Sequence, residues 1–397
     1  MTQRYDVVVA GGGPAGAAAA WQAAQAGARV LLLEKAQFPR DKPCGDGLTP
    51  RAVGFIQKMG MAQDVAKFHR VEGARVYSPS EWSLSFPHRP GMPDHGHVAR
   101  RSELDGMLFE NAGSMGAELR QGAECVATVT DRNGRVGGVT LKGGEQIRAD
   151  AVIAADGAYS PIKRSLSLHS QYNGYSAIAI RAEMTAHCPD GDSLDIHLKL
   201  TSGGKQLPGY GWVFPLGGGR VNIGLGYVNS YKNWHQINAA ELLGEFLATL
   251  PAQWRLPSIA ELRKSHAIQA WRLPMGFTAW PPWRPGVLFA GDALGAARPA
   301  SGAGISKALQ SGLAAGECAV AALNNGGPDD FTDYAHRMKA AWGTEYRRGR
   351  FFHRVVAIPA VAEAGVKVLD SVNHPAVRSR LLFWEGWREA AASGARR

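Results

Sequence analysis

Hydrophobic and polar positions near the start of the chain follow the pattern of a strand, a helix and a second strand. Residues 5–10 form a short apolar run rich in β-branched side chains, which is typical of a buried parallel strand. The alanine-rich stretch 15–26 favours a helix, and Gly27 ends it. A second apolar run at 29–33 is closed by Glu34. The pattern predicts a βαβ unit.

The middle of the chain has a different pattern. Residues 70–95 and 170–280 are rich in β-branched and aromatic side chains. In the segment 193–200 apolar and polar residues alternate, which is typical of a sheet with one wetted face. We expect a mixed or antiparallel sheet here, with His197 on its solvent side.

Composition narrows the class of protein. The chain has 397 residues, 45% of them hydrophobic and 20% charged, which is typical of a soluble protein with two or three domains. No apolar run reaches the roughly 18 residues of a membrane-spanning helix, so we expect a cytoplasmic protein. The net charge of +10 favours anionic partners, but it is diffuse and no nucleic-acid-binding motif accompanies it. The four cysteines lack metal-ligand spacing, so no metal is expected.

The turn between the first strand and the helix has the spacing GxGxxG. Gly11 allows a tight turn, Gly13 lets the backbone approach a pyrophosphate, and Gly16 lets the helix pack on the strand. The helix N-terminus after Gly13, with Ala15 in its first turn, offers N–H groups to phosphates. Glu34 stands 23 positions after Gly11 and can accept hydrogen bonds from a ribose. We predict a dinucleotide site rather than an ordinary glycine-rich turn.

Separated segments favour FAD over NAD as the dinucleotide. Asp156 and Asp292 each follow an apolar strand, where a carboxylate can bind ribose or ribityl hydroxyls. Arg101 precedes a predicted helix and can bind the pyrophosphate. A second glycine cluster reaches Gly304, and a helix begins near Ile305 that can present its N-terminus to the cofactor. No second GxGxxG opens a helix, so a separate NAD(P)H domain is not expected.

These motifs together resemble a known group. "GGGPAG" near the start, "AADGAYSP" at 154–161 and the "GD" segment after 290 resemble the FAD-dependent monooxygenase and reductase superfamily. Within it, "PCGDGLTPRAV" at 43–53 and "PGYGWVFPLGGGRVNIGLG" at 208–226 resemble the geranylgeranyl reductase family, which includes menaquinone reductase and digeranylgeranylglycerophospholipid reductase.

The resemblance implies an α/β fold. It implies a glutathione-reductase-type, Rossmann-like FAD domain, a mixed or antiparallel β-sheet substrate domain and a helical C-terminal cap. The expected FAD domain comprises residues 1–75, 96–168 and 283–330, the substrate domain 76–95 and 169–282, and the C-terminal helical region 331–397.

Motif and resemblance together name the expected cofactor contacts. The turn around Cys44 is expected against the flavin ring, on the side where substrate arrives. For Cys125 the resemblance implies only a backbone contact with the adenine end. The full set is Gly11, Gly13, Ala15, Gly16, Glu34, Arg40, Cys44, Gly45, Gly47, Arg101, Cys125, Asp156, Asp292, Gly304 and Ile305.

An aromatic triplet is the expected substrate pocket. Strand alternation puts Tyr210, Trp212 and Phe214 on one face. Their block resembles the one that lines an elongated hydrophobic pocket in the family. An ordinary aromatic core stripe stays open as the alternative.

The resemblance implies reduction of a C=C bond in an isoprenoid or other hydrophobic substrate, with NAD(P)H or another reductant as transient electron donor. An isolated alkene needs a proton donor, and the catalytic candidates are Cys44 and Asp46. Arg40 and Lys42 are expected to lower the pKa of the Cys44 thiol. Asp46 is alternatively a hydrogen-bonding turn residue.

A monooxygenase that hydroxylates or epoxidises a hydrophobic or aromatic natural product is the alternative function. It stays open because Ala303 stands where the family usually has an acid, and Lys307 where a smaller side chain is expected. Arg51 and Arg298 are expected to face solvent or FAD. A halogenase is disfavoured because the block at 210–215 does not match the WxWxIP type.

The C-terminal region combines basic and aromatic side chains, among them Phe351, Phe352, Trp384 and Trp387. Two interpretations stay open. The helices are either a cap with solvated arginines or a peripheral contact with an anionic bilayer.

Overall fold

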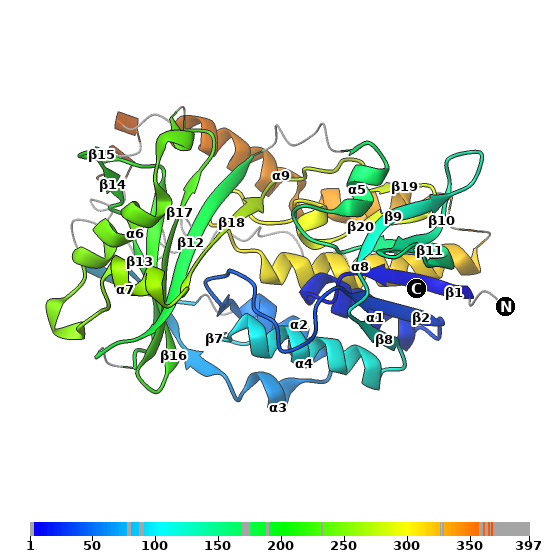
Figure 1. Cartoon of the computed structure of the whole chain (residues 1–397), viewed down its shortest axis with the longest axis horizontal. Helices are drawn as coiled ribbons and strands as arrows, with labels where there is room; N and C mark the ends of the chain where they lie inside the picture. The colour runs from blue at the N-terminus through cyan, green and yellow to red at the C-terminus, as the bar shows by residue number, and fades with distance from the viewer. Residues whose placement is uncertain are drawn as a thin grey trace.

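Two β-sheets lie next to each other along the long axis of the molecule (Figure 1). The computed structural model describes residues 4–367 except 78–80, 87–90, 169–174, 188–189, 232, 326, 328, 357–359, 362–363 and 366, without the side chains of 81–85 and 352–356. Within these residues, no helix is both long and apolar enough to cross a membrane.

The first sheet has eight strands and is built around the N-terminal βαβ unit. Its order is β19-β20-β11-β1-β2-β8, and the β9–β10 hairpin branches from β11. The strands from β20 to β8 are parallel. Apolar runs buried on both faces form β1, β2, β20 and the end of β11, as the sequence predicts, whereas the edge strand β8 is polar. The bounds are β1 (Arg4–Ala10), β2 (Val30–Glu34), β8 (Glu118–Gln121), β9 (Cys125–Thr130), β10 (Val136–Leu141), β11 (Gln146–Ala154), β19 (Trp283–Arg284) and β20 (Val287–Phe289).

Helices pack against this sheet and against one another. The helix α1 (Pro14–Gln25) lies between α4 (Arg101–Ser114) and α8 (Ile305–Asn324) and contacts both (Figure 1). Short helices α2 (Pro50–Lys58), α3 (Ala62–Val65) and α5 (Pro161–Ser165) complete this half. A small sheet of β3 (Gly47–Leu48), β7 (Gly96–Val98) and β4 (His69–Val71) follows the Cys44 turn.

The second sheet has seven strands in the order β18-β12-β17-β16-β13-β5-β6. It is mixed, because β5 and β13 are parallel whereas the other pairs are antiparallel. The bounds are β5 (Gly73–Tyr77), β6 (Glu81–Ser85), β12 (Ser176–Thr185), β13 (Ser193–His197), β16 (Gly209–Gly217), β17 (Arg220–Val228) and β18 (Ile268–Pro274). β5 spans the predicted domain boundary between 75 and 76.

The helices α6 (Ala239–Ala248) and α7 (Ile259–Lys264) cover the outer face of this sheet (Figure 1). The prediction that His197 faces solvent is wrong. Its ring stacks on Tyr77 with 4.4 Å between centroids and meets Phe246 of α6 edge-on at 5.2 Å. Burial beneath α6 lowers the pKa of His197 to about 4. Strand alternation alone does not show which face a helix covers.

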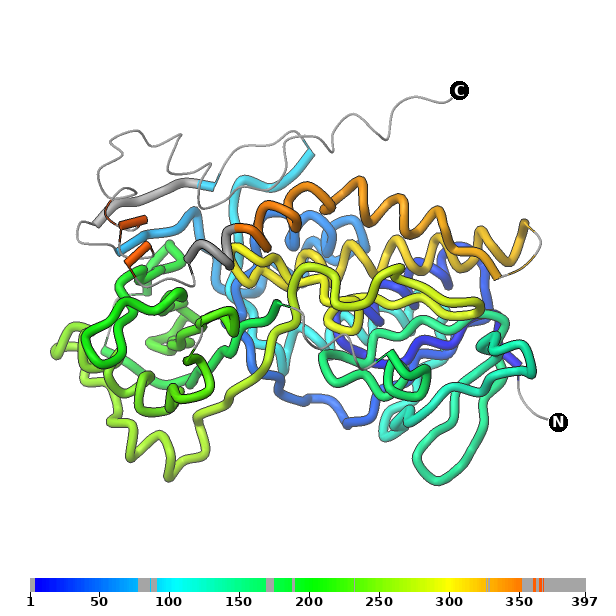
Figure 2. The backbone as a smooth tube through the Cα atoms, turned by 90° about the horizontal axis from the view of Figure 1, so that it is seen from above, coloured from blue at the N-terminus to red at the C-terminus, as the bar shows by residue number. Residues whose placement is uncertain are grey.

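The helix α9 (Thr332–Val356) runs alongside α8 (Figure 2). Its Trp342 and Tyr346 are fully buried, so this part of the C-terminal region is packed into the first half of the molecule. Phe351 near its end is 68% exposed. The predicted aromatic positions Trp384 and Trp387 and the side chain of Phe352 lie outside the described residues.

Candidate functional site

The turn between β1 and α1 has a shape that only glycine permits. Gly11 has φ of +102°, and a Cβ added there would lie 2.4 Å from the carbonyl oxygen of Ala155. A Cβ at Gly16 would lie 1.8 Å from the carbonyl oxygen of Gly11. The helix therefore begins directly against the end of the strand, with its N-terminus at the carboxyl edge of the parallel sheet.

The N-terminus of α1 can accept an anion. Gly13 is its N-cap, no described side chain caps it, and its first turn contains no acid. Arg40 and Arg101 face it, because a Cβ at Gly13 would lie 3.6 Å and 3.9 Å from their Nη2 atoms. Asp105 holds both guanidinium groups, at 2.8 Å from Arg40 and 2.6 Å from Arg101. Helix N–H groups and two positioned cations suit a pyrophosphate.

Glu34 lies beside the same turn at the end of β2. Its Oε2 accepts hydrogen bonds from the backbone N–H of Gly12 at 2.9 Å and from Arg40 at 3.2 Å. Its Oε1 accepts from the backbone N–H of Ala36 at 3.0 Å. A carboxylate has further lone pairs, so this fixed group can also accept from ribose hydroxyls.

The segment before α8 brings a second acid and a second helix N-terminus. Asp292 follows β20 and pairs with Lys42 Nζ at 2.7 Å. Gly304 is the N-cap of α8, which again has no described side-chain cap and no acid in its first turn. Beside Ile305, the buried Ser306 hydroxyl has no hydrogen-bond partner among the described residues. Two uncapped helix N-termini and an unpartnered hydroxyl fit a long, anionic cofactor such as FAD.

Two further predicted contacts belong to the first sheet: Asp156 follows the end of β11, and Cys125 begins β9. Asp156 Oδ2 accepts a hydrogen bond from the backbone N–H of Ile162 at 3.1 Å, and burial raises its pKa. Cys125 is buried at the start of β9, and burial raises the pKa of its thiol to about 12. An inert thiol is consistent with a role limited to its backbone.

The Cys44 turn lies against the inner face of β16. Cβ atoms added at Gly45 and Gly47 would lie 3.3 Å and 3.2 Å from the Phe214 ring, and the one at Gly45 also 3.3 Å from Trp212 Nε1. A side chain at either glycine would press on these rings, so glycine favours the close approach. Tyr210 extends the contact, because its hydroxyl donates to the carbonyl of Ser301 at 2.6 Å. The aromatic face thus joins the Cys44 turn to the segment before α8.

Asn222 is a site residue that the sequence did not predict. It lies opposite Phe214 in the β16–β17 register and is fully buried. Its Oδ1 accepts from Trp212 Nε1 at 2.9 Å, and its Nδ2 donates to Asp46 Oδ2 at 2.7 Å and to the carbonyl of Cys44 at 2.8 Å. Its only signal in the sequence is an amide within the apolar run "RVNIGLGYV".

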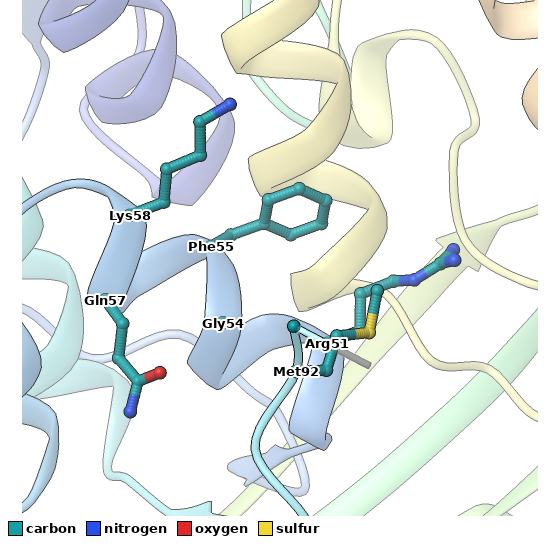
Figure 3. A pocket seen from close by; sticks show the side chains of 7 residues that line it. Arg51, Gly54, Phe55, Gln57, Lys58 and Met92 are labelled. Atoms are coloured by element: carbon teal, nitrogen blue, oxygen red, sulfur yellow. The ribbon is translucent and has the colours of Figure 1, made fainter. Parts of the chain in front are cut away.

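A cavity of about 470 Å³ opens beside α2, which begins directly after the Cys44 turn (Figure 3). It is lined by Arg51, Gly54, Phe55, Gln57, Lys58, Gly91 and Met92. The Phe55 ring points toward α8 (Figure 3), and α2 contacts α8.

Comparison with known proteins agrees with this geometry. The family profile described as an FAD binding domain matches residues 4–347. Menaquinone reductase of Mycobacterium tuberculosis is 36% identical over 79% of this chain and 76% of its own. Digeranylgeranylglycerophospholipid reductase 1 of Methanopyrus kandleri is 31% identical over 86% and 87%. The chain belongs to the geranylgeranyl reductase family of FAD-dependent oxidoreductases.

A solved structure shares the fold of this flavoenzyme. The crystal structure of a geranylgeranyl bacteriochlorophyll reductase-like protein from Thermoplasma acidophilum superimposes with a TM-score of 0.81. It covers 96% of both chains at 24% identity. The α/β fold expected from the sequence is therefore confirmed.

The net shift of the Cys44 pKa is opposite to the predicted one, although Lys42 does lower this pKa as predicted. Burial raises the pKa of this thiol, and the neighbouring Asp46 carboxylate raises it further. Arg40 pairs with Glu34 and Asp105, and Lys42 pairs with Asp292. Lys42 and Arg101 lower the pKa of the thiol, but burial and Asp46 outweigh them. In this reductase-family chain Cys44 stays a protonated thiol.

Of the two predicted environments of Arg51 and Arg298, solvent or FAD, burial excludes solvent for both. Arg298 Nε lies 2.7 Å from Glu345 Oε1, and Lys307 Nζ lies 3.1 Å from Glu345 Oε2. Glu345 belongs to α9, so a distant helix supplies an acid beside the segment where Ala303 replaces the family's usual acid. The 38 positions between Lys307 and Glu345 hide this pairing from local sequence patterns.

Proposed function

We propose that this FAD-dependent oxidoreductase reduces a C=C bond of an isoprenoid substrate, with NAD(P)H or another reductant as electron donor. One observation carries the proposal. The turn with Cys44 and Asp46 packs against the face of Tyr210, Trp212 and Phe214, so proton-bearing groups adjoin an apolar, aromatic surface. The names of the two relatives, menaquinone reductase and digeranylgeranylglycerophospholipid reductase, support an isoprenoid substrate.

The cofactor contacts follow from the same geometry. The N-terminus of α1 with Arg40 and Arg101 would hold the pyrophosphate, and Glu34 the ribose. Asp292 would bind ribityl hydroxyls. The remaining proposed contacts are Gly11, Gly13, Ala15, Gly16, Cys44, Gly45, Gly47, Cys125, Asp156, Gly304 and Ile305. When bound, FAD supplies a two-electron carrier between the reductant and the alkene.

The protein must also supply a proton and exclude water. The Cys44 thiol and the Asp46 carboxyl both have a raised pKa, so each can be protonated near neutral pH. The glycines beside them let the turn approach the aromatic face closely. Tyr210, Trp212 and Phe214 would orient the isoprenoid chain through apolar contacts.

Reduction is favoured over oxygenation because the two relatives at 36% and 31% identity are both named reductases. The test is anaerobic incubation of the protein with FAD, NADPH or dithionite, and menaquinone or a geranylgeranyl lipid. After any quinol has been reoxidised to the quinone, a product heavier by two hydrogen atoms is expected. Parallel reactions in air show whether one oxygen atom is added instead, which would support the monooxygenase. Reactions without reductant are the control.

We also propose a cytoplasmic protein that reaches its substrate at a membrane surface. In α9, Arg347 and Arg348 are exposed within one turn of the exposed ring of Phe351, and Lys339 is exposed further along the same helix. Cationic and aromatic side chains on one helix favour anionic lipid. Co-sedimentation with anionic vesicles, but not with neutral ones, is expected, and salt should weaken it. If the same fraction of protein sediments with anionic and with neutral vesicles, the proposal is contradicted.

A further inference from the structure

A buried hydrogen-bonded chain links the aromatic strand to the Cys44 turn. Trp212 Nε1 can only donate, so the atom of Asn222 that faces it, at 2.9 Å, is the amide oxygen. The amide nitrogen must then face the turn, where Asp46 Oδ2 and the Cys44 carbonyl lie at 2.7 Å and 2.8 Å. The indole therefore sets the orientation of the Asn222 amide.

The orientation of Asn222 decides which oxygen of Asp46 can carry a proton. Both N–H groups of the amide are used, one by the Cys44 carbonyl and one by Asp46 Oδ2. Because Oδ2 accepts a hydrogen bond, a carboxyl proton resides on Oδ1. Asp46 is fully buried, and its Oδ1 has no hydrogen-bond partner among the described residues. An O–H in that position would have only a bound ligand to donate to.

The surroundings of Asp46 are consistent with a neutral acid. Burial raises its pKa to about 7, against the opposing attraction of Arg181 and Arg101 and the hydrogen bond from Asn222. Arg181 itself is engaged by Asp41 at 2.8 Å and by Glu183 at 3.3 Å. The charged and titratable groups facing Asp46 are Cys44 on its own turn, Arg100 and Arg101 at the start of α4, and Arg181 and Glu183 on β12.

We propose that Asn222 is a positioning residue that holds Asp46 with its Oδ1–H unshared by the described residues, so that it donates to a substrate whose binding parts the Cys44 turn from the aromatic face. The inference rests on the proposed alkene reduction. Two electrons and one proton come from the reduced cofactor, and the second proton comes from Asp46. The O–H bond of Asp46 breaks as a C–H bond forms, and the resulting carboxylate keeps its hydrogen bond from Asn222. Water that enters when the product leaves returns the proton before the next turnover.

The test compares the wild-type holoenzyme with Asp46→Asn, Asn222→Ala and a control, Asn111→Ala. Asn111, in the last turns of α4, donates its amide to the carbonyl of Met59 at the end of α2. Each protein is labelled with ¹³C at its aspartate carboxyls. The infrared band of protonated carboxyl groups is then measured as a function of pH. A protonated carboxyl that titrates near pH 7 and is missing in Asp46→Asn belongs to Asp46. Asn222→Ala should move this titration up by about one pH unit, because the carboxylate loses a hydrogen bond.

Turnover gives the second readout. Asp46→Asn should lower kcat by about 100-fold, and Asn222→Ala by about tenfold with the basic limb of the pH profile moved upward. KM should stay unchanged in both. Asn111→Ala should match the wild type. The inference is overturned if no Asp46 carboxyl titrates near pH 7, or if Asn222→Ala titrates like the wild type.

Two precautions keep the outcome decisive. If Asn222→Ala does not fold, Trp212→Phe replaces it, since it removes the donor to Asn222 and keeps an aromatic ring. An upward shift in its titration supports the inference, and an unchanged one overturns it. The infrared titration needs no substrate. A wild-type protein that titrates as expected but reduces no alkene therefore contradicts the proposed function and not the orientation of Asp46.

Discussion

The Lys42 ammonium lies 2.7 Å from the Asp292 carboxylate, which ties the Cys44 loop to the segment before α8. The two side chains are 250 positions apart in the sequence and are 26% and 14% exposed. A partly exposed pair of this kind contributes little to stability. The ion pair instead keeps the Cys44 loop and the segment before α8, two parts of the proposed flavin site, next to each other.

Asp292→Ala should weaken FAD binding. The substitution removes a carboxylate placed for ribityl hydroxyls and releases Lys42. Hydrogen bonds to a charged group are worth about 1.5–3 kcal/mol, so the Kd for FAD should rise by about 10- to 100-fold. Flavin fluorescence during titration of the apoprotein measures it. Asp64→Ala, which removes the partner of exposed Lys67, is the control and should bind FAD normally.

The Cys44 thiol should react slowly with alkylating agents. Its pKa is raised by burial, and the thiolate is the nucleophile, so little reactive form exists at pH 7. Iodoacetamide labelling of Cys44, located by mass spectrometry, should be negligible at pH 7 and should increase only above the range of an ordinary cysteine. Rapid labelling at pH 7 that Lys42→Ala or Arg40→Ala abolishes would restore the thiolate prediction.

Asp46 should make the free energy of unfolding depend on pH. Its pKa is about 7 in the folded chain and about 3.9 when unfolded. Between these values the folded state holds a proton that the unfolded state has lost, so stability falls as pH rises through this window. Wild-type apoprotein should lose on the order of 2 kcal/mol between pH 5 and pH 8 relative to Asp46→Asn. Urea unfolding of both proteins at the two pH values measures these free energies of unfolding. An equal change with pH in wild type and Asp46→Asn would contradict the prediction.

Glu345→Gln should destabilise the protein strongly. It removes the carboxylate that lies 2.7 Å from Arg298 and 3.1 Å from Lys307, both of which are buried. Breaking a buried ion pair on one side typically costs about 3–5 kcal/mol. Thermal unfolding measures the loss. Adding Lys307→Met should recover part of it, because one buried cation is then gone. An unchanged midpoint in Glu345→Gln would show that α9 does not hold this segment.

The sequence alone determined the parts of the site that neighbours along the chain create. Gly11, Gly16 and Glu34 belong to one βαβ unit, where tight turns and backbone approach depend on contacts within about 30 residues. The shared face of Tyr210, Trp212 and Phe214 follows from the two-residue period of a strand.

Only the tertiary structure decided the pKa values of the site residues and their hydrogen-bond and ion-pair partners. Asn222 meets Asp46 across 176 positions, and Glu345 reaches Lys307 from a separate helix. The direction of the Cys44 pKa shift was mispredicted because burial and the Asp46 carboxylate outweigh the lowering by Lys42. A pKa depends on burial and on charges within a few ångströms, and folding determines both.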